Sequence, residues 1–449
     1  MTFLPVMQGH FSIFAGLCGF CCVAQRSKRK KPVIKFSKTV LDNGLRVIVH
    51  EEKGTPLVAF NVLYDVGSKD ESPGRTGFAH LFEHLMFGGS ANIPDFDTPV
   101  QNAGGENNAF TNSDVTNFYE VLPANNLEVA MWLESDRMNC LNFSQEVLDV
   151  QKRVVVEEFK ETCLNEPYGD VWHHISELAY KVHPYQWPTI GKVPEHVEQA
   201  TLDEVKEFFY RHYRPNNAIV VISGNVREAQ VLPLVEKWFG DIPPGPLRKR
   251  QLPAEPPQTE MRSKVIDNAP VPMDSIYLAF RMCGRTDADY YTTDLLSDVL
   301  SNGASSRFYQ RLLKDRQLFS AIDCYISGTI DPGLFIIEGK PAEGISLEEA
   351  EDAIWSELAL VRNELVEEEE LQKVKNKVES SLLFSEMSVL NKAINLAFFE
   401  LLGDADLINQ EIDAYRQVQQ KDILRVANDI LRKENCCRLI YRTNEELKN

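Results

Sequence analysis

Short β-type runs and longer helical runs of hydrophobic residues alternate along the chain. Residues 38–52 hold two β-rich runs on either side of Asp42-Asn43-Gly44, a strong turn signal that predicts a β-hairpin. Apolar runs predict further strands at 56–68, 114–123 and 216–226. These segments indicate that β-sheet makes up much of the first half of the chain.

Apolar residues at helical spacing mark the segments between these strands. They occur at 77–90, 125–140, 145–162 and 201–213. The last of these opens with Thr201 and Glu204, three residues apart, which is the pattern of a capping box. The pattern therefore predicts helices that alternate with strands.

Two pairs of segments show that the second half of the chain repeats the first. Residues 205–222 match 424–441 at an offset of 219, and both read as an amphipathic helix, an asparagine turn and an apolar strand. Residues 80–90 match 294–304 at an offset of 214, with the same apolar positions. The repeat indicates one structural unit used twice.

A stretch rich in proline and in charged residues separates the two copies. Such a stretch forms neither a long helix nor a central strand, and we read it as a linker. We expect an α+β fold of two homologous α/β-sandwich-type halves, each a mostly antiparallel sheet with helices packed on it. The predicted boundaries are an N-terminal extension at 1–33, a first half at 34–240, the linker at 241–262 and a second half at 263–449.

Composition and charge narrow the class of protein. The chain has 449 residues, of which 43% are hydrophobic and 25% are charged, as in folded globular proteins. Its net charge of −19 argues against nucleic acid and anionic membranes as main partners. The nine cysteines are an odd number without a zinc-finger arrangement, which indicates reduced thiols and a cytoplasmic location.

The N-terminus leaves two interpretations open. The apolar run at 11–24 is shorter than the roughly 20 residues that span a bilayer, and its basic residues follow it instead of preceding it. We therefore expect no integral membrane segment and read residues 1–33 as disordered or as an incorrectly assigned start. The alternative is a weak anchor or targeting segment, which would make the protein membrane-associated or exported.

Three polar side chains interrupt the apolar helix predicted at 77–90. His80 and His84 are four residues apart, so both imidazoles lie on one helix face and can reach one ion, with Glu83 beside them. Zinc held by two histidines and a carboxylate keeps one position for water, whose pKa falls to about 7. The second copy keeps the apolar face but has no counterpart of this trio, so packing alone does not require it.

A third ligand is expected on the helix predicted at 145–162. Its Val-Val-Val-Glu-Glu run offers Glu157, Glu158 and Glu161. Helical phase alone does not choose between them, because Glu158 belongs to one stripe of the helix and the other two belong to a second stripe. Since no histidine lies beyond residue 212, a histidine-ligated metal must belong to the first half.

These features resemble the pitrilysin/insulinase family of zinc peptidases with the inverted His-x-x-Glu-His motif, most closely its short bacterial and mitochondrial-processing type. The resemblance covers about 35–445. It implies one Zn²⁺ per chain, ligands His80, His84 and Glu158, and Glu83 as general base, with Glu161 as a minor alternative ligand. Gln151 stands where many relatives carry a glutamate that supports the third ligand.

The resemblance also implies where a substrate binds. Residues 104–111 match the family's Gly-Gly-x-x-Asn-Ala-x-Thr edge strand, which pairs with extended peptide backbone. Asn108, Ala109 and Phe110 would then contact the substrate. Unfolded segments suit such a site better than folded proteins do.

One departure from the family concerns the second half. Members that act alone carry an Arg and a Tyr seven residues apart, and here these positions are Leu313 and Ser320. Arg316 and Tyr309 lie nearby but out of register. We therefore expect a related partner subunit that supplies the pair in a heterodimer; the alternative is a homodimer.

The sequence thus favours a zinc-dependent endopeptidase that cleaves peptides or unfolded polypeptide segments with metal-activated water. The main alternative is a non-catalytic structural or recognition subunit of the same fold, which the missing Arg/Tyr pair favours. A zinc hydrolase of a non-peptide substrate is a third class, against which the edge-strand motif argues.

Overall fold

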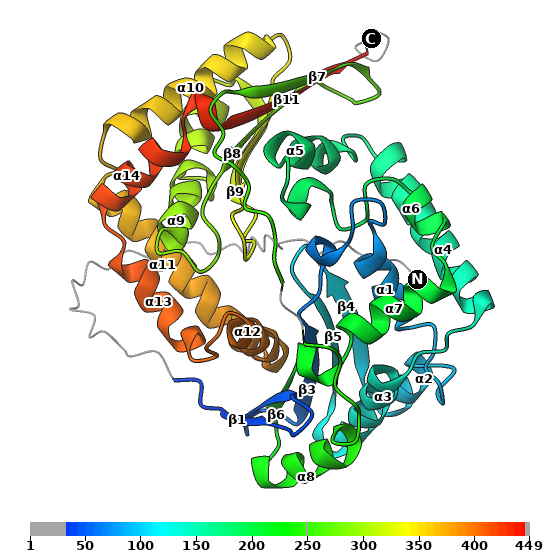
Figure 1. Ribbon diagram of the computed structural model, residues 1–449. Coiled ribbons are helices and arrows are strands. Elements are labelled where there is room, and N and C mark those ends of the chain that lie inside the picture. The colour runs from blue at the N-terminus through cyan, green and yellow to red at the C-terminus, as the bar shows by residue number, and fades with distance from the viewer. Residues whose placement is uncertain (1–32, 248–249, 445–449) are drawn as a thin grey trace. The chain divides into compact units, whose positions relative to one another are not determined.

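The computed structural model describes residues 33–247 and 250–444. Strands of the first half form a six-stranded sheet in the order β1-β2-β6-β3-β5-β4 (Figure 1). These strands are β1 (Ser37–Val40), β2 (Arg46–Glu51), β3 (Leu57–Tyr64), β4 (Glu106–Thr111), β5 (Thr116–Pro123) and β6 (Ala218–Gly224). The pair β2–β6 is parallel and the other neighbours are antiparallel.

Strands of the second half form a five-stranded sheet with the same connectivity, in the order β7-β11-β8-β10-β9. They are β7 (Arg262–Ala269), β8 (Ser275–Arg281), β9 (Phe319–Ile326), β10 (Leu334–Pro341) and β11 (Cys436–Thr443). The pair β7–β11 is parallel, as β2–β6 is, and the rest is antiparallel. The predicted α+β fold of two mostly antiparallel halves is therefore confirmed.

Groups of helices follow groups of strands along both halves of the chain. In the first half they are α1 (Phe78–Leu85), α2 (Asp97–Asn102), α3 (Leu127–Asn139), α4 (Gln145–Phe159), α5 (Val171–Ala179), α6 (Glu195–Glu198), α7 (Leu202–His212) and α8 (Glu228–Phe239). In the second half they are α9 (Tyr290–Ser301), α10 (Leu347–Asn363), α11 (Glu368–Ser385), α12 (Val389–Leu401), α13 (Leu407–Gln417) and α14 (Gln420–Ile430).

Shorter helical turns link these elements. The 3₁₀ turns are η1 (Ser68–Asp70), η2 (Ala124–Asn126), η4 (Pro184–Gln186), η5 (Pro215–Asn217) and η7 (Lys433–Asn435). Two π-helical segments occur, η3 (Lys160–Asn165) directly after α4 and η6 (Phe308–Asp315).

Each sheet is covered on one face by helices of its own half. The core of the first half joins α1, α3, α4, α7 and α8 to the sheet, and its largest buried side chains include Phe60, Phe82 and Phe118. The core of the second half joins α9, α10, α11 and α14 to β8 and β10. Burial of this apolar area is the main favourable term in the stability of each half.

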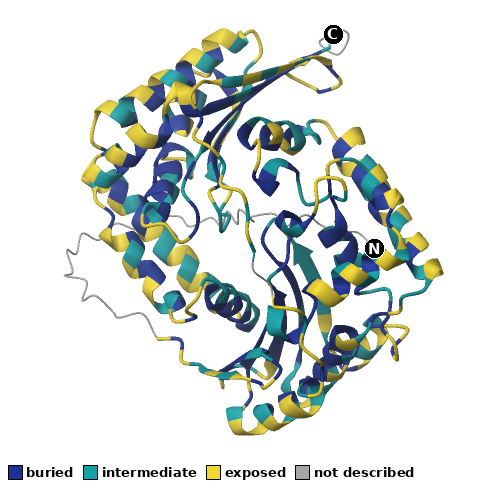
Figure 2. Cartoon of the chain, in the orientation of Figure 1, coloured by how far each residue is buried: buried dark blue, intermediate teal, exposed yellow. Residues whose placement is uncertain are grey.

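A helix of the opposite half covers the other face of each sheet. Leu396 and Ala393 of α12 pack on Ile48 and Leu63 of the first sheet, and Figure 2 shows α12 as largely buried there. In return, α5 of the first half packs on the second sheet through Ile175. The two halves therefore share their cores.

The local predictions agree with these elements. The hairpin of β1 and β2 surrounds the predicted turn, where Gly44 has a φ of 86°. Thr201 caps α7, and its hydroxyl accepts the backbone N–H of Glu204. Of the predicted domain boundaries, the extension at 1–33 lies almost wholly outside the described residues, and the division into domains stays a prediction.

No described helix by itself has the length and hydrophobicity of a membrane span. The bent pair α11–α12 reaches them only when both helices are counted together. Since α12 buries its apolar side chains on the first sheet, the fold already accounts for its composition.

Candidate metal centre

The helix α1 carries the polar trio and is fixed at its N-terminus by two devices. Gly77 has a φ of 85°, and a Cβ there would lie 2.8 Å from the carbonyl oxygen of Ile190, so glycine is required. The buried carboxylate of Glu71 accepts the backbone N–H groups of Gly77 (2.9 Å) and Ala79 (2.8 Å). These bonds satisfy N–H groups that have no partner within the helix.

The apolar face of α1 sets which way the trio points. Phe78, Leu81, Phe82 and Leu85 are buried in the first core. The helix is therefore held at a fixed rotation, with the polar residues on the opposite side. Burial of these apolar side chains therefore positions His80, Glu83 and His84.

His80, His84 and Glu158 converge on one point from α1 and α4. The Nε2 atoms of His80 and His84 are 3.3 Å apart. Glu158 places Oε2 at 3.3 Å from His84 Nε2 and Oε1 at 3.6 Å from His80 Nε2. One ligand atom from each of the three lies within 4.8 Å of the others.

This donor set fits a tetrahedral zinc site. Two ligand atoms at about 2.1 Å from a tetrahedral ion lie roughly 3.4 Å apart, close to the distances seen here. Both histidines turn Nε2 toward the shared point, and the buried Nδ1 of His80 has no hydrogen-bond partner in the described structure. Two imidazoles and a carboxylate are also a zinc donor set by chemistry.

The electrostatics favour neutral histidine and ionised glutamate. Burial lowers the pKa of His80 to about 4, which keeps its imidazole neutral at pH 7. Burial alone would raise the pKa of Glu158, but the hydrogen bond to His84 and the nearby His80 outweigh it and lower that pKa. These are the protonation states that metal ligands need.

Packing of α4 decides the helical phase that the sequence left open. Leu148 and Val155 are buried, whereas Val150 and Val154 are 40% and 43% exposed. Glu158 follows the buried stripe and therefore faces α1.

The two other glutamates point elsewhere. Glu157 is exposed and pairs with Lys160 at 2.6 Å. Glu161 is exposed and lies in the π-helical segment η3, beyond the end of α4. The structure thus brings only Glu158 of the three candidates to the histidines, and its role as ligand stays a prediction.

Glu83 lies on the same helix, half-buried beside β4. Burial raises its pKa, and the side chain and backbone of Thr111 partly oppose that rise. Thr111 is the last residue of β4 and a functional residue that sequence reasoning missed. The signal that could have identified Thr111 is its position as the last residue of the edge-strand motif at 104–111.

The predicted substrate residues lie on a true edge strand. Asn108, Ala109 and Phe110 belong to β4, the terminal strand of the first sheet, which pairs with β5. The strand also lies beside α1. Gln151 lies on α4, two helical turns before Glu158.

The second-half positions of the missing pair show no substitute for it. Leu313 is half-buried in η6, and the hydroxyl of Ser320 donates to the carbonyl of Lys340 at 3.1 Å. Tyr309 and Arg316 are exposed near the same segment. Neither position of the family pair is occupied by a cation or a phenol.

Comparison with known proteins identifies two domain types in the chain. Residues 46–192 match the family model described as "Insulinase (Peptidase family M16)", and residues 199–378 match "Peptidase M16 inactive domain". The first range contains the whole candidate metal centre, and the second contains the copy without the trio.

Relatives cover nearly the whole described chain. Zinc protease PqqE of Helicobacter pylori is 27% identical over 88% of this chain and 90% of its own length. The uncharacterized zinc protease YmxG of Bacillus subtilis is 24% identical over 89% of this chain and 96% of its own. A crystal structure of a protease from Helicobacter pylori superposes with a TM-score of 0.86 at 26% identity, covering 91% of this chain and all of that one.

The duplicated fold, the two family models and these relatives agree with one another. The chain belongs to the M16 family of zinc peptidases, the pitrilysin/insulinase family.

Proposed function

We propose that the protein is a zinc-dependent endopeptidase that hydrolyses peptides or unfolded polypeptide segments. The observation that carries the proposal is the convergence of His80, His84 and Glu158 at 3.3–3.6 Å beside Glu83. The curated relatives named as zinc proteases support it.

His80, His84 and Glu158 would hold one zinc ion per chain. When bound there, zinc would supply a Lewis acid that polarises the scissile carbonyl and acidifies a water molecule. The low pKa of His80 means that no proton has to be displaced from it at pH 7 before the ion binds.

Glu83 acts as the general base and then as the general acid. Burial raises the pKa of its carboxyl group, so it takes up a proton from water more readily than an exposed glutamate does. The same proton is then transferred to the nitrogen of the leaving amine. Glu83 is next to His84 in the chain, on the helix that packs beside β4.

The edge strand β4 would hold the substrate. An extended peptide that pairs with β4 lies beside α1, which places its backbone near Glu83. Side chains of Asn108, Ala109 and Phe110 would contact it. Entry beside α1 requires an extended segment that can leave its own fold, so the preferred substrates are peptides and unfolded segments.

A partner subunit of the same family would supply the Arg/Tyr pair that Leu313 and Ser320 replace. The full active form would then be a heterodimer in which this chain holds the metal. The second candidate, a non-catalytic subunit of the same fold, rests on the same two substitutions.

Zinc analysis combined with peptide cleavage tests the proposal. The purified chain should contain one zinc per chain, and Glu83→Gln should keep that zinc while the cleavage rate falls by about 10²–10⁴-fold. A chain that binds zinc but cleaves no peptide, alone or with any co-purifying protein, supports the non-catalytic alternative. Full activity of the chain alone would contradict the heterodimer.

A further inference from the structure

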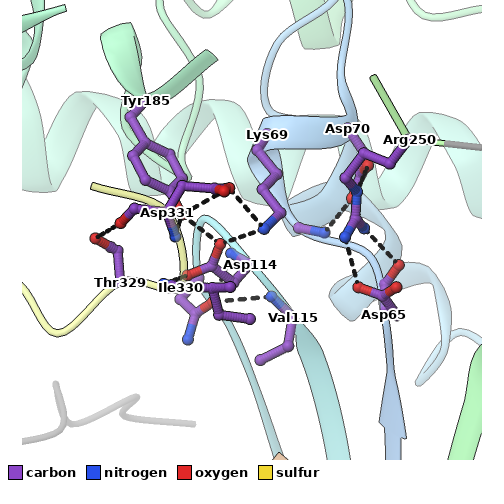
Figure 3. Close-up of polar contacts among 12 residues, drawn as sticks. Asp65, Lys69, Asp70, Asp114, Val115, Tyr185, Arg250, Thr329, Ile330 and Asp331 are labelled. Carbon is purple, nitrogen blue, oxygen red and sulfur yellow. Dashed lines mark hydrogen bonds and ion pairs between the residues drawn. The ribbon is translucent and has the colours of Figure 1, made fainter. Parts of the chain in front are cut away.

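A buried polar cluster joins the two halves of the chain next to the substrate strand (Figure 3). Its centre is Asp114, in the turn between β4 and β5, with 4% of its surface exposed. The carboxylate accepts from Lys69 Nζ at 2.7 Å, from the hydroxyl of Tyr185, and from the backbone N–H of Ile330 at 2.9 Å. Ile330 belongs to the β9–β10 loop of the second half.

Lys69 extends the cluster to a second residue of that loop. Its ammonium group is 2% exposed and lies 3.1 Å from Asp331 Oδ2. Two carboxylates, one from each half, thus share one buried cation. Bonds of this kind between charged groups are about twice as strong as neutral ones, and removal of a partner is costly in a buried site.

The backbone around Lys69 contacts the β4–β5 turn directly. Ser68 N donates to Asn112 O at 3.2 Å and Lys69 N donates to Ser113 O at 3.0 Å. A Cβ at Gly67 would lie 2.5 Å from Ser113, so the two backbones approach as closely as glycine allows. The segment 67–69 and the turn 112–114 therefore move as one body.

The same segment leads to the metal helix. Two residues after Lys69, the carboxylate of Glu71 caps the N-terminus of α1. Three residues before Asp114, Thr111 ends β4, the strand that packs beside α1. The cluster thus connects the β9–β10 loop both to the helix that carries the histidines and to the strand that would hold the substrate.

The linker is bound to the same place. Arg250 pairs with Asp70 at 2.9 Å and with Asp65 at 2.8 Å, on the other side of η1 (Figure 3). The segment around Lys69 is therefore held from the second half by the β9–β10 loop and from the linker by Arg250.

We propose that Asp114 is a positioning residue, which fixes β4 in its substrate-pairing conformation by tying the β4–β5 turn to the β9–β10 loop of the second half. The proposal rests on the proposed function for its catalytic consequence. In this proposal the second half, which lacks the histidine–glutamate trio, holds the edge strand β4 in place beside Glu83.

Hydrogen–deuterium exchange on the zinc-loaded full chain tests the link without any need for activity. In Asp114→Asn, the amides that pair β4 with β5 should exchange about tenfold faster than in the parent, because the charge-assisted bonds of the turn are lost. Asp331→Asn keeps the bond between Lys69 and Asp114, and because Asp331 is a third exposed it should fold even if Asp114→Asn does not. We expect a rise of about threefold in that variant.

Lys392→Met is the matched control. Lys392 is a buried lysine of α12 that joins the halves through Glu52 at 3.0 Å, away from β4. It should leave exchange in 106–116 at the parent rate. Unchanged exchange there in both aspartate variants, or an equal rise in Lys392→Met, would overturn the proposal.

Kinetics on an unstructured peptide separate positioning from mere stability. Asp114→Asn should raise KM about tenfold with a smaller effect on kcat and no loss of zinc, since the strand that binds substrate is less ordered. Faster exchange with an unchanged KM would overturn the positioning role. If the parent cleaves no peptide, alone or with a co-purifying partner subunit, the proposed function fails, whereas the exchange data still decide whether Asp114 holds β4.

Discussion

The helix α1, which carries the candidate metal ligands, and its counterpart α9 bury the same apolar positions and differ in their polar residues. Leu81 and Phe82 of α1 correspond to Leu295 and Leu296 of α9, and all four are fully buried. Each helix lies against a partner of its own half, α4 for α1 and α11 for α9. The same buried positions therefore occur in α1 and α9, which carry different polar residues.

The polar residues of α9 make side-chain contacts of their own at the positions that correspond to the candidate metal ligands of α1. Asp294, at the position of His80, accepts from the hydroxyl of Tyr415 at 2.6 Å. Asp298, at the position of His84, accepts from Asn302 at 2.5 Å and lies near the ammonium group of Lys377 on α11. A lysine cation thus stands on the partner helix of the second half, where the first half has the anionic Glu158.

This difference shows that the fold of each half does not require His80, Glu83 and His84, because α9 keeps the same buried positions without them. In the first half, two imidazoles and one carboxylate leave a site that a divalent cation would complete. In the second half, side-chain hydrogen bonds and one lysine satisfy the polar groups. The two polar faces thus differ while the buried apolar positions of α1 and α9 correspond.

The largest expected effect comes from transfer of the second-half residues into the first half. His80→Asp with His84→Asp should give a folded chain that binds no zinc and loses at least about 10³-fold in peptide cleavage. Circular dichroism and zinc analysis would check the first two outcomes and a peptide assay the third. Retained zinc-dependent cleavage would disprove the ligand assignment.

Substitution on α4 tests the choice among the glutamates. Glu158→Gln should lower zinc affinity and activity by about 10²-fold or more, because a ligand is lost. Glu157→Gln is the matched control, since Glu157 is exposed and only pairs with Lys160. It should keep activity within about twofold, as exposed ion pairs contribute little. Equal losses in both variants would mean that helical phase does not select the ligand.

Removal of the metal should destabilise the first half selectively. A ligand present at about 1,000 times its Kd stabilises the folded state by about 4 kcal/mol, so a chelator should lower the Tm and added zinc should restore it. Hydrogen exchange should increase around α1 and α4 and remain unchanged around α9 and α11. A uniform response of both halves would argue against a single site in the first half.

The smallest expected effect is a pH-dependent change in the free energy of unfolding that is caused by Asp298, the counterpart of His84 in the second half. Burial, together with Asp294, raises the pKa of Asp298 from 3.8 to about 7, against the opposing effects of Asn302 and Lys377. The folded state therefore holds more protons than the unfolded state between these values, and the free energy of unfolding falls as pH rises through this window.

Asp298→Asn should remove that penalty. The gain in stability of the variant over the parent should be about 1–2 kcal/mol larger at pH 8 than at pH 5, after allowance for partial exposure. Urea unfolding at the two pH values measures it. A gain that does not change with pH would show that Asp298 stays ionised in the folded chain.

The sequence by itself predicted many of the helices and strands and picked out the helix that carries the candidate metal ligands. Hydrophobic period, the turn at Asp42-Asn43-Gly44 and the cap at Thr201 act over a few residues, so they can be read directly. The internal repeat separated His80, Glu83 and His84 from the packing residues, because the second copy keeps the apolar face without them.

The family resemblance implied Glu158, but only the tertiary structure shows that Glu158, and neither Glu157 nor Glu161, lies beside His80 and His84. All three lie on one short stretch, and the choice depends on which side of α4 is buried against α1, a contact between residues about 70 positions apart. Helical period gives the angle between side chains and leaves the rotation of the whole helix open.

The exchange of helices between the halves and the cluster at Asp114 were equally invisible in the sequence. Lys69, Asp114 and Asp331 come from three distant segments, and each reads alone as an ordinary surface charge. The burial of Lys69 and Asp114 follows from the packing of the second half on the first, which no local pattern encodes. Local periodicity thus specified the helices and strands, and long-range packing specified which polar side chains come into contact.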